Sequence, residues 1–241
     1  MIGMGRQSLK VNLQPLLDAS GTAVRAVCDV DDWRLDNAKN AVDKHYGNRD
    51  CLTMRDWREI VDREDIDAVM IGPPDHWHGP MALAAVLAGK HVSCEKPLTM
   101  SVAEGRLLAD AAAKAGVVFR TDTECRSNPV MHAPAERVRN GAIGKLRRML
   151  VTVPTGDAAG GDPTPMPVPG GFDYDLWLGP APFDPYTVDR VHAPKSYNRP
   201  GWMRCSNTCE GMITNWGTHP LDIAQLAHDS ERTGPVEDRA T

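Results

Sequence analysis

The sequence lacks the features of a membrane or secreted protein. No uninterrupted apolar run comes near the roughly 18 residues that a membrane-spanning helix needs. The first residues show neither the basic nor the apolar region of a signal peptide. We therefore expect a soluble, cytoplasmic protein with no membrane partner. An export signal lost with a missing N-terminus stays open as the alternative.

An excess of positive charge is also lacking. Lysine and arginine number 27 against 32 aspartates and glutamates, which gives a net charge of −5. This balance argues against a nucleic acid as a partner. Hydrophobic residues (41%) and charged residues (24%) stand at ordinary globular proportions, which argues against wholesale disorder. The 241 residues suffice for one large domain or two small ones.

The spacing of a metal site is missing as well. Six cysteines are scattered along the chain, and several lie in apolar stretches typical of strands, which favours reduced, buried thiols. Cys205 and Cys209 have no second pair at zinc-like spacing, and His76 and His78 alone are too few ligands. We therefore expect no metal.

The first half of the chain alternates short β-branched runs with longer amphipathic stretches, the pattern of βαβ units around a parallel sheet. The expected strands are residues 23–28, 68–71, 92–94, 117–119 and, later, 147–153. The expected helices are residues 32–46, 54–62, 80–88, 101–115, 131–140 and 219–228. Only residues 1–2 precede the first glycine turn, and few elements follow residue 153, so we expect a chain truncated at both ends.

A glycine-rich turn opens the chain. Its residues are Gly3, Met4, Gly5, Arg6 and Gln7. They resemble a dinucleotide-binding turn, in which the first glycine permits the tight bend and the second lets the backbone approach a pyrophosphate.

An acidic residue stands at the end of the next expected strand, at about the spacing of the residue that accepts the ribose hydroxyls of a dinucleotide. This residue is Asp29. Its carboxylate would repel a 2′-phosphate, which favours NAD over NADP. The alternative interpretation is a glycine turn followed by a helix-capping aspartate.

Two polar loops follow expected strands, where open α/β sheets bind ligands. The first loop holds Pro74, Asp75 and His78, which we expect to contact the cofactor. The second holds Glu95 and Lys96, with the same expectation. A lysine in this place can also bind a substrate oxygen, whereas a solvated lysine at a strand end is the plain alternative.

An ordered set of motifs along nearly the whole chain resembles the Gfo/Idh/MocA family, named for glucose–fructose oxidoreductase, inositol dehydrogenase and MocA. The motifs are Gly3-Met4-Gly5-Arg6-Gln7, Cys28-Asp29-Val30-Asp31, Pro74-Asp75-His76-Trp77-His78, Cys94-Glu95-Lys96-Pro97-Leu98, Arg126-Ser127-Asn128-Pro129, Asp175-Leu176-Trp177-Leu178-Gly179-Pro180 and Trp216-Gly217-Thr218-His219.

The resemblance implies a Rossmann-type, doubly wound parallel sheet that binds NAD(P), followed by an α/β domain with an open, mostly antiparallel sheet. We place the first domain at residues 1–122 and a truncated substrate domain at residues 123–241. The implied activity is hydride transfer between nicotinamide and a sugar, polyol or related compound. Members of the family form homo-oligomers, which the truncation puts in doubt for this chain.

The resemblance also assigns catalytic roles. His219 corresponds to the histidine that removes a hydroxyl proton, Lys96 to the lysine that holds the substrate oxygen, and Asp222 to an acid that orients or tunes the site. Arg126 is a candidate for substrate contact. Asn215 departs from the pattern, because many members carry an aspartate there.

Two rival functions remain open from the sequence. One is an NAD-binding or interaction protein that lacks a working substrate domain. The other is a glycosidase that uses tightly held NAD for transient oxidation.

Overall fold

The computed structural model of the chain describes residues 1–156 and 161–233, which belong to two compact units. Unit 1 comprises Met1–Thr121 and Asp157–Gly211, and unit 2 comprises Asp122–Gly156 and Met212–Thr241. Residues 161–211 therefore pack with the N-terminal part of the chain. The domain boundary at residue 122 stays a prediction. The two units are defined by contacts between residues, and such units need not coincide with evolutionary domains.

Unit 1 is built on the expected parallel sheet. β1 (Ala26–Cys28) pairs in parallel with β2 (Leu52–Met54), and β3 (Ala68–Ile71) pairs in parallel with β4 (His91–Glu95), beside which lies β5 (Phe119–Asp122). Ile2 forms parallel bridges to both Cys28 and Ile71, so it takes the place of a strand between β1 and β3. The resulting order, β2-β1-Ile2-β3-β4-β5, is that of the doubly wound dinucleotide-binding fold.

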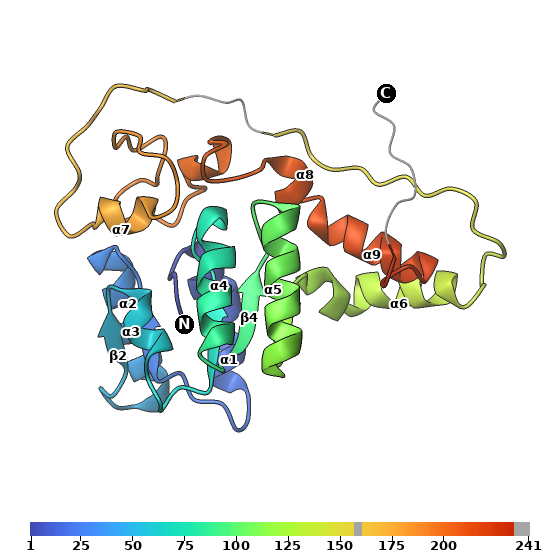
Figure 1. Cartoon of the computed structure of the whole chain (residues 1–241), viewed down its shortest axis with the longest axis horizontal. Coiled ribbons are helices and arrows are strands. Elements are labelled where there is room, and N and C mark those ends of the chain that lie inside the picture. The colour runs from blue at the N-terminus through green and yellow to red at the C-terminus, as the bar shows by residue number, and fades with distance from the viewer. Residues whose placement is uncertain (157–160, 234–241) are drawn as a thin grey trace. The chain divides into compact units, whose positions relative to one another are not determined.

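Helices cover both faces of this sheet, because the pleat sends alternate side chains to opposite sides. Val27 and Met70 join the apolar cluster under α1 (Leu13–Asp18) and α2 (Asp32–Tyr46). Cys28 and Ile71 join the cluster under α3 (Trp57–Val61), α4 (His78–Leu87) and α5 (Val102–Ala115). Figure 1 shows α4 and α5 packed side by side. The two clusters make a three-layer core that holds the strand ends in place.

Several sequence expectations were wrong in their bounds or type, among them the strand expected at residues 117–119, which lies at Phe119–Asp122 as β5. Residues 52–54 form β2, and the helix expected from residue 54 begins at Trp57, because the Asp56 side chain accepts the Arg58 N–H and caps it there. β1 begins at Ala26 and not at residue 23. Residues 147–153 form no strand: a strand needs a hydrogen-bonding neighbour, and no described segment pairs with them.

The described part of the second half of unit 1, residues 161–211, has its own small core and little regular structure. It contains α7 (Tyr174–Leu178) and the short helix η4 (Gly201–Arg204), with Trp177 and Tyr186 buried between them and neighbouring loops. We refer to it as the 161–211 segment. Backbone hydrogen bonds fasten it to the end of β1: Asp173 N donates to Val30 O at 2.9 Å, and Asp32 N donates to Gly171 O at 2.8 Å.

The regular structure in the described residues of unit 2 is helical, apart from Asp122 at the end of β5, and residues 141–156 are irregular. The helices are η3 (Glu124–Ser127), α6 (Pro129–Arg139), α8 (Met212–Asn215) and α9 (Thr218–His228). α6 packs along α9 (Figure 1). The antiparallel sheet that the family resemblance implies is not among these residues. Within residues 1–156 and 161–233, no helix combines the length and apolar character needed to cross a membrane.

Candidate cofactor and catalytic site

The glycine turn has the backbone that the sequence predicts. Gly3 has a φ of +77°, and a Cβ atom added there would lie 2.5 Å from the backbone nitrogen of Pro73. Only glycine fits this position without strain. At Gly5 an added Cβ would make an ordinary contact with Arg34 Nη1 at 3.7 Å, so this backbone is not crowded. An uncrowded backbone at this position suits the approach of a pyrophosphate.

Ser8, which replaces the third glycine of the fingerprint, meets a glycine of another loop. Its side chain is buried, and a Cβ added at Gly72 would lie 2.3 Å from Ser8 Oγ. The third glycine normally allows close packing of helix on strand. Here Gly72, directly after β3, supplies the missing room. The sequence reasoning missed Gly72, although its place after a buried strand was visible.

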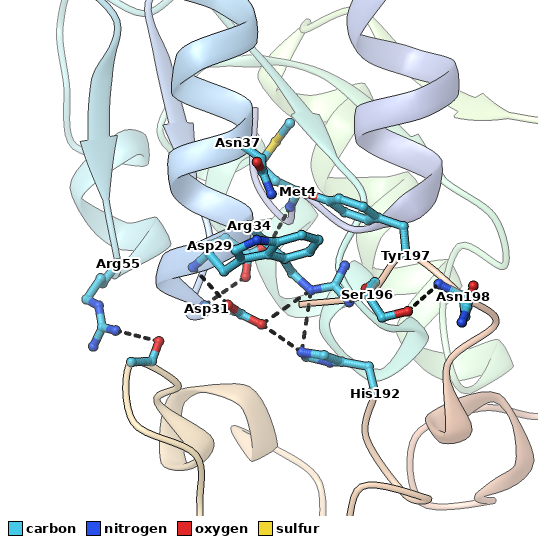
Figure 2. Close-up of polar contacts among 12 residues, drawn as sticks. Met4, Asp29, Asp31, Arg34, Asn37, Arg55, His192, Ser196, Tyr197 and Asn198 are labelled. Carbon is cyan, nitrogen blue, oxygen red and sulfur yellow. Dashed lines mark hydrogen bonds and ion pairs between the residues drawn. The ribbon is translucent and has the colours of Figure 1, made fainter. Parts of the chain in front are cut away.

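Asp29 holds the glycine turn to the end of β1. Its Oδ2 accepts the Met4 N–H at 2.6 Å, and its Oδ1 accepts the Asp31 N–H at 2.9 Å (Figure 2). Burial raises the pKa of the Asp29 carboxyl, while the Arg34 charge and the two amides act in the opposite direction. The predicted residues Met4 and Asp29 are thus brought together at the corner where a dinucleotide ribose would lie.

The residues of this corner fit a dinucleotide. The Asp29 carboxylate oxygens have lone pairs for ribose hydroxyls beyond the two amides that they accept. At Gly5 the nearest atom to an added Cβ is only at ordinary contact distance, and Leu9 N donates to Gly5 O at 3.0 Å, which begins the helix that follows the turn. Arg6 is exposed, and Gln7 is half-buried at the start of this helix.

A polar cluster missed from the sequence joins this corner to the 161–211 segment. His192 Nε2 lies 2.9 Å from Asp31 Oδ2 and 3.4 Å from Arg34 Nε. The carboxylate is the acceptor at the shorter distance, so we assign the hydrogen to Nε2. Burial alone would raise the pKa of Asp31, but the hydrogen bond and charge of His192, together with Arg34, lower it. Asp31 belongs to a quoted motif, but no sequence signal marked Arg34 or linked either residue to His192, about 160 positions further on.

The loop after β3 places a buried carboxyl near the predicted lysine. Asp75 is 2% exposed, and its Oδ2 has no hydrogen-bond partner among the described residues. Burial raises the pKa of Asp75 to about 7, against the effects of a hydrogen bond from Cys209 and the charge of Lys96. Pro74 is half-buried just before it. A carboxyl that titrates near neutral pH is a candidate for proton exchange.

His78 ties the two predicted loops together. Its Nδ1 lies 2.6 Å from Pro97 O, and its Nε2 lies 2.9 Å from Pro73 O. Burial lowers the pKa of His78 to about 4. The ring is therefore neutral at pH 7 and donates to one of the two carbonyls. In this structure His78 positions both loops, and direct contact with a cofactor stays a prediction.

The loop after β4 is fastened to the helix that follows the glycine turn. Glu95 is buried, and its Oε1 accepts the Asn12 amide N–H at 2.8 Å. Its Oε2 accepts the backbone N–H of Lys96 at 3.3 Å. Lys96 itself is half-buried at the carboxyl end of the strand. Glu95 thus holds the backbone of the predicted substrate-binding lysine close to the glycine turn.

The remaining predicted residues lie in unit 2. His219 is buried in the first turn of α9, and Asp222 follows one turn later on the same helix. Asp222 forms a two-pronged ion pair with Arg126, with Nε–Oδ2 at 2.6 Å and Nη2–Oδ1 at 2.9 Å. The structure thus brings Arg126 and Asp222 together. The expected meeting of Lys96 with His219 joins the two units and stays a prediction.

The cysteines agree with the expected reduced state. All six are free thiols, and Cys28, Cys51, Cys94 and Cys209 are buried. In the described ranges, no three histidine, cysteine, aspartate or glutamate side chains gather as a set that could hold a metal ion.

The parallel sheet, its left-handed glycine turn and the aspartate at the end of β1 define a dinucleotide-binding Rossmann protein. A model of the Gfo/Idh/MocA oxidoreductase family, described as an NAD-binding Rossmann fold, matches residues 1–123. The model of that family's C-terminal alpha/beta domain matches residues 159–240. The chain therefore belongs to the Gfo/Idh/MocA oxidoreductase family, as its motifs indicate.

Characterised relatives are sugar and polyol enzymes by name. Levoglucosan dehydrogenase of Pseudarthrobacter phenanthrenivorans is 37% identical over 91 residues, which cover 38% of this chain and 23% of the relative. Glycosyl hydrolase family 109 protein 1 of a Shewanella species is 30% identical over 154 residues, which cover 60% of this chain and 32% of the relative. Myo-inositol 2-dehydrogenase of Thermotoga maritima is 28% identical over 185 residues, which cover 74% of this chain and 51% of the relative. The chain thus spans about half or less of each relative.

Solved structures agree on the fold. Myo-inositol 2-dehydrogenase from Lactobacillus plantarum matches with a TM-score of 0.53 and 29% identity, over 60% of this chain and 41% of that one. The Y186F mutant of KijD10, a 3-ketoreductase from Actinomadura kijaniata in complex with TDP-benzene and NADP, matches with a TM-score of 0.51 and 25% identity (61% and 43%). The fold class predicted from the sequence is confirmed for the Rossmann part.

Proposed function

We propose that the chain is an NAD-dependent oxidoreductase that transfers a hydride between nicotinamide and a carbon bearing a hydroxyl group in a sugar or polyol. The observation that carries this proposal is the corner where Asp29 accepts the Met4 amide beside Gly5, whose backbone no atom crowds closer than ordinary contact. Such a corner suits a ribose and a pyrophosphate. Membership of the family and the names of the sugar and polyol relatives support the substrate class.

The charges at the corner support NAD over NADP. Asp29 presents a carboxylate where a 2′-phosphate would lie. Arg34 could compensate that charge, but its guanidinium already donates to Ser196 O at 3.0 Å and stands 3.5 Å from Asp31. Arg34 is also buried. A phosphate would therefore have to compete with these partners for the arginine.

The proposed catalytic roles follow from the chemistry of each side chain. Bound NAD supplies the hydride acceptor. Lys96 would hold the substrate oxygen and stabilise its developing negative charge, and His219 would remove the hydroxyl proton. Asp222, held by Arg126, would fix the turn of α9 that carries His219.

Absorbance at 340 nm tests the activity directly. The purified chain is mixed with NAD⁺ and a panel that contains levoglucosan, myo-inositol, other polyols and aldoses, and NADH formation is followed. We expect reduction of NAD⁺ with at least one member and a weaker rate with NADP⁺. If NADH binds but no member of the panel is oxidised, the chain is a non-catalytic dinucleotide-binding protein and the proposal is wrong.

The glycosidase alternative has one specific support, the 30% identity to glycosyl hydrolase family 109 protein 1 over 60% of the chain. A glycosidase that oxidises its substrate only transiently regenerates NAD⁺ in each cycle. Release of p-nitrophenol from p-nitrophenyl glycosides without net NADH would therefore favour this activity over dehydrogenation.

A further inference from the structure

One aromatic residue of the 161–211 segment reaches the dinucleotide corner. Tyr197 lies among residues of the Rossmann part: its ring centroid is 4.8 Å from that of Trp33, and the Arg34 guanidinium carbon is 5.1 Å from the ring centre. Figure 2 shows the ring pointing from the 161–211 segment toward Met4 and Asn37. The Asn37 amide lies 3.5 Å from the Tyr197 hydroxyl oxygen.

Tyr197 also lies near a side chain of the helix that follows the glycine turn. Lys10 lies in the π-helix η1 (Ser8–Asn12), which follows the glycine turn, and its ammonium is 5.8 Å from the Tyr197 ring centre. Burial raises the pKa of the Tyr197 hydroxyl, the Asn37 hydrogen bond and the Arg34 charge oppose this, and the negative charges of Asp29 and Asp31 contribute a smaller upward effect. Tyr197 therefore stands between the helix after the glycine turn and α2, within reach of the electrostatic field of Asp29.

Tyr197 is held there by the polar cluster that joins the two parts of unit 1. Arg34 donates to the carbonyl of Ser196, the residue before Tyr197, at 3.0 Å. His192 stands five residues before Tyr197, and its Nε2 lies 2.9 Å from Asp31 Oδ2. Two attachments on the same short stretch fix the backbone that carries the ring, so the position of Tyr197 is not that of a loosely exposed side chain.

The same stretch leaves room for a ligand. A cleft of about 340 Å³ lies between the first turn of α2 and the 161–211 segment, and Trp33, Asp31 and His192 are among its walls. This volume lies within the range of about 300–1,000 Å³ that is typical of small-molecule sites. His192, Pro194 and Lys195 of the same stretch line this cleft, whereas Tyr197, Met4 and Asp29 are not among its lining residues.

We propose that residues 192–197 form a clasp over the adenosine half of the dinucleotide, with Tyr197 as a cofactor-contacting residue contributed by the 161–211 segment. The inference rests on the proposed binding of NAD and adds a binding residue outside the Rossmann sequence motifs. Aromatic rings beside a nucleotide contribute both apolar contact area and stacking. The clasp concerns binding of the adenosine half and requires no turnover.

Calorimetry with two halves of the cofactor tests the clasp. The full chain is titrated with ADP-ribose and, separately, with nicotinamide mononucleotide. For Tyr197→Ala we expect ADP-ribose to bind about tenfold more weakly, in line with loss of one aromatic contact to a base. Binding of nicotinamide mononucleotide should not change. Phe183→Ala is the matched control, because it removes an aromatic ring from the same segment at a side chain that is 82% exposed.

Hydrogen exchange of wild-type protein provides a second readout that needs no variant. Peptides that contain residues 192–197 should exchange more slowly when ADP-ribose is bound. Unchanged exchange, or an ADP-ribose affinity in Tyr197→Ala within twofold of wild type, would overturn the clasp. Tighter binding in Tyr197→Ala would overturn it too, because the ring would then obstruct the ligand. A chain that binds ADP-ribose with the expected pattern but oxidises no substrate would refute the proposed activity and leave the clasp standing.

Discussion

The backbone N–H of Met4 lies 2.6 Å from Asp29 Oδ2, so the glycine turn is attached to the residue that we expect to bind the ribose. Replacing Asp29 with asparagine keeps the shape but removes the charge and one of the two acceptors. Hydrogen bonds to charged groups contribute about 1.5–3 kcal/mol. We expect Asp29→Asn to weaken NADH binding by roughly ten- to hundredfold, as measured by fluorescence transfer from tryptophan.

The same variant should alter cofactor choice. Without the negative charge, a 2′-phosphate is no longer repelled, so the affinity ratio of NADH to NADPH should fall. Asp110→Asn is the control, since Asp110 is exposed and paired with Arg106 away from this corner. If Asp29→Asn keeps the wild-type ratio of NADH to NADPH affinity, Asp29 only holds the glycine turn in place and does not select the cofactor.

The catalytic assignments predict that substitutions of Lys96 and His219 impair turnover much more than they impair cofactor binding. Lys96→Met and His219→Asn should each lower kcat by about 10²–10⁴, the usual range for loss of a group that transfers or holds a proton. NADH affinity should stay near that of wild type in His219→Asn, and in Lys96→Met, where a predicted cofactor contact is lost, it should fall far less than kcat because the Asp29 corner is untouched. Lys114→Met, at an exposed lysine of α5, is the control for loss of positive charge. Turnover that survives both substitutions would remove these residues from the mechanism.

The sequence predicted most of the Rossmann part because each signal there is local. The helix at residues 32–46 was predicted with its observed bounds, since Asp31 caps its start and Gly47 ends it in a left-handed conformation. The strand at residues 68–71 was equally clear from its run of apolar residues. β2 was missed because Leu52–Met54 is short and largely exposed, so it shows no pattern of burial.

The candidate site was only partly visible for a different reason. Asp29 and Lys96 follow strands, and such positions can be found by counting along the chain. The contacts of Arg34 with His192 and Ser196 join residues about 160 positions apart. No local pattern in composition or spacing marks such a pair, so Tyr197 and its attachments could be found only in three dimensions.

The close contact between Ser8 and Gly72 predicts a rescue experiment. Gly72→Ala would place a methyl group 2.3 Å from the buried Ser8 Oγ, and overpacking of this kind costs typically about 1–3 kcal/mol. Ser8→Gly removes the obstructing side chain, so the double variant Ser8→Gly/Gly72→Ala should regain much of the lost stability. Urea denaturation of the four proteins measures this.

The double variant tests whether the effects of Ser8→Gly and Gly72→Ala on the free energy of unfolding simply add. Gly21→Ala serves as a control with nothing within 4 Å of the added atom, although its positive φ adds some strain of its own. If the loss in Gly72→Ala persists in full after Ser8→Gly, the helix and the strand do not meet through these two side chains.

The buried carboxyl of Asp75 predicts a particular dependence of stability on pH. Burial raises its pKa from 3.8 to about 7 in the folded protein. Such a group favours the folded state while protonated, so its contribution is complete below pH 3.8 and is lost as the pH rises through 7. Relative to wild type, Asp75→Asn should therefore gain stability between pH 4 and pH 7, by up to a few kcal/mol.

Thermal or urea unfolding at several pH values checks the sign. The quantity compared is the difference in unfolding free energy between Asp75→Asn and wild type, which removes the titration of all other groups. Asp36→Asn, at an exposed carboxylate of α2, should give a difference that varies little with pH. A difference for Asp75→Asn that falls with rising pH would mean that the folded protein holds this carboxyl charged.

The ion pair of Arg126 with Asp222 predicts that these residues act as a unit. Their side chains are 32% and 20% exposed, so solvent screens the pair in part, and we expect a coupling energy of about 1 kcal/mol. A double-mutant cycle of Arg126→Gln and Asp222→Asn measures it by urea denaturation. The exposed pair Arg106–Asp110, at 3.9 Å, is the control and should show coupling near zero.

Turnover measured on the same four proteins separates positioning from direct participation. If Asp222 acts by fixing α9 through Arg126, both single variants and the double variant should lower kcat to a similar extent, because each breaks the same link. Restoring a charged partner with Arg126→Lys should recover part of the activity. A loss confined to Asp222→Asn, with Arg126→Gln at the wild-type rate, would instead indicate that the carboxylate itself acts on the substrate or on His219.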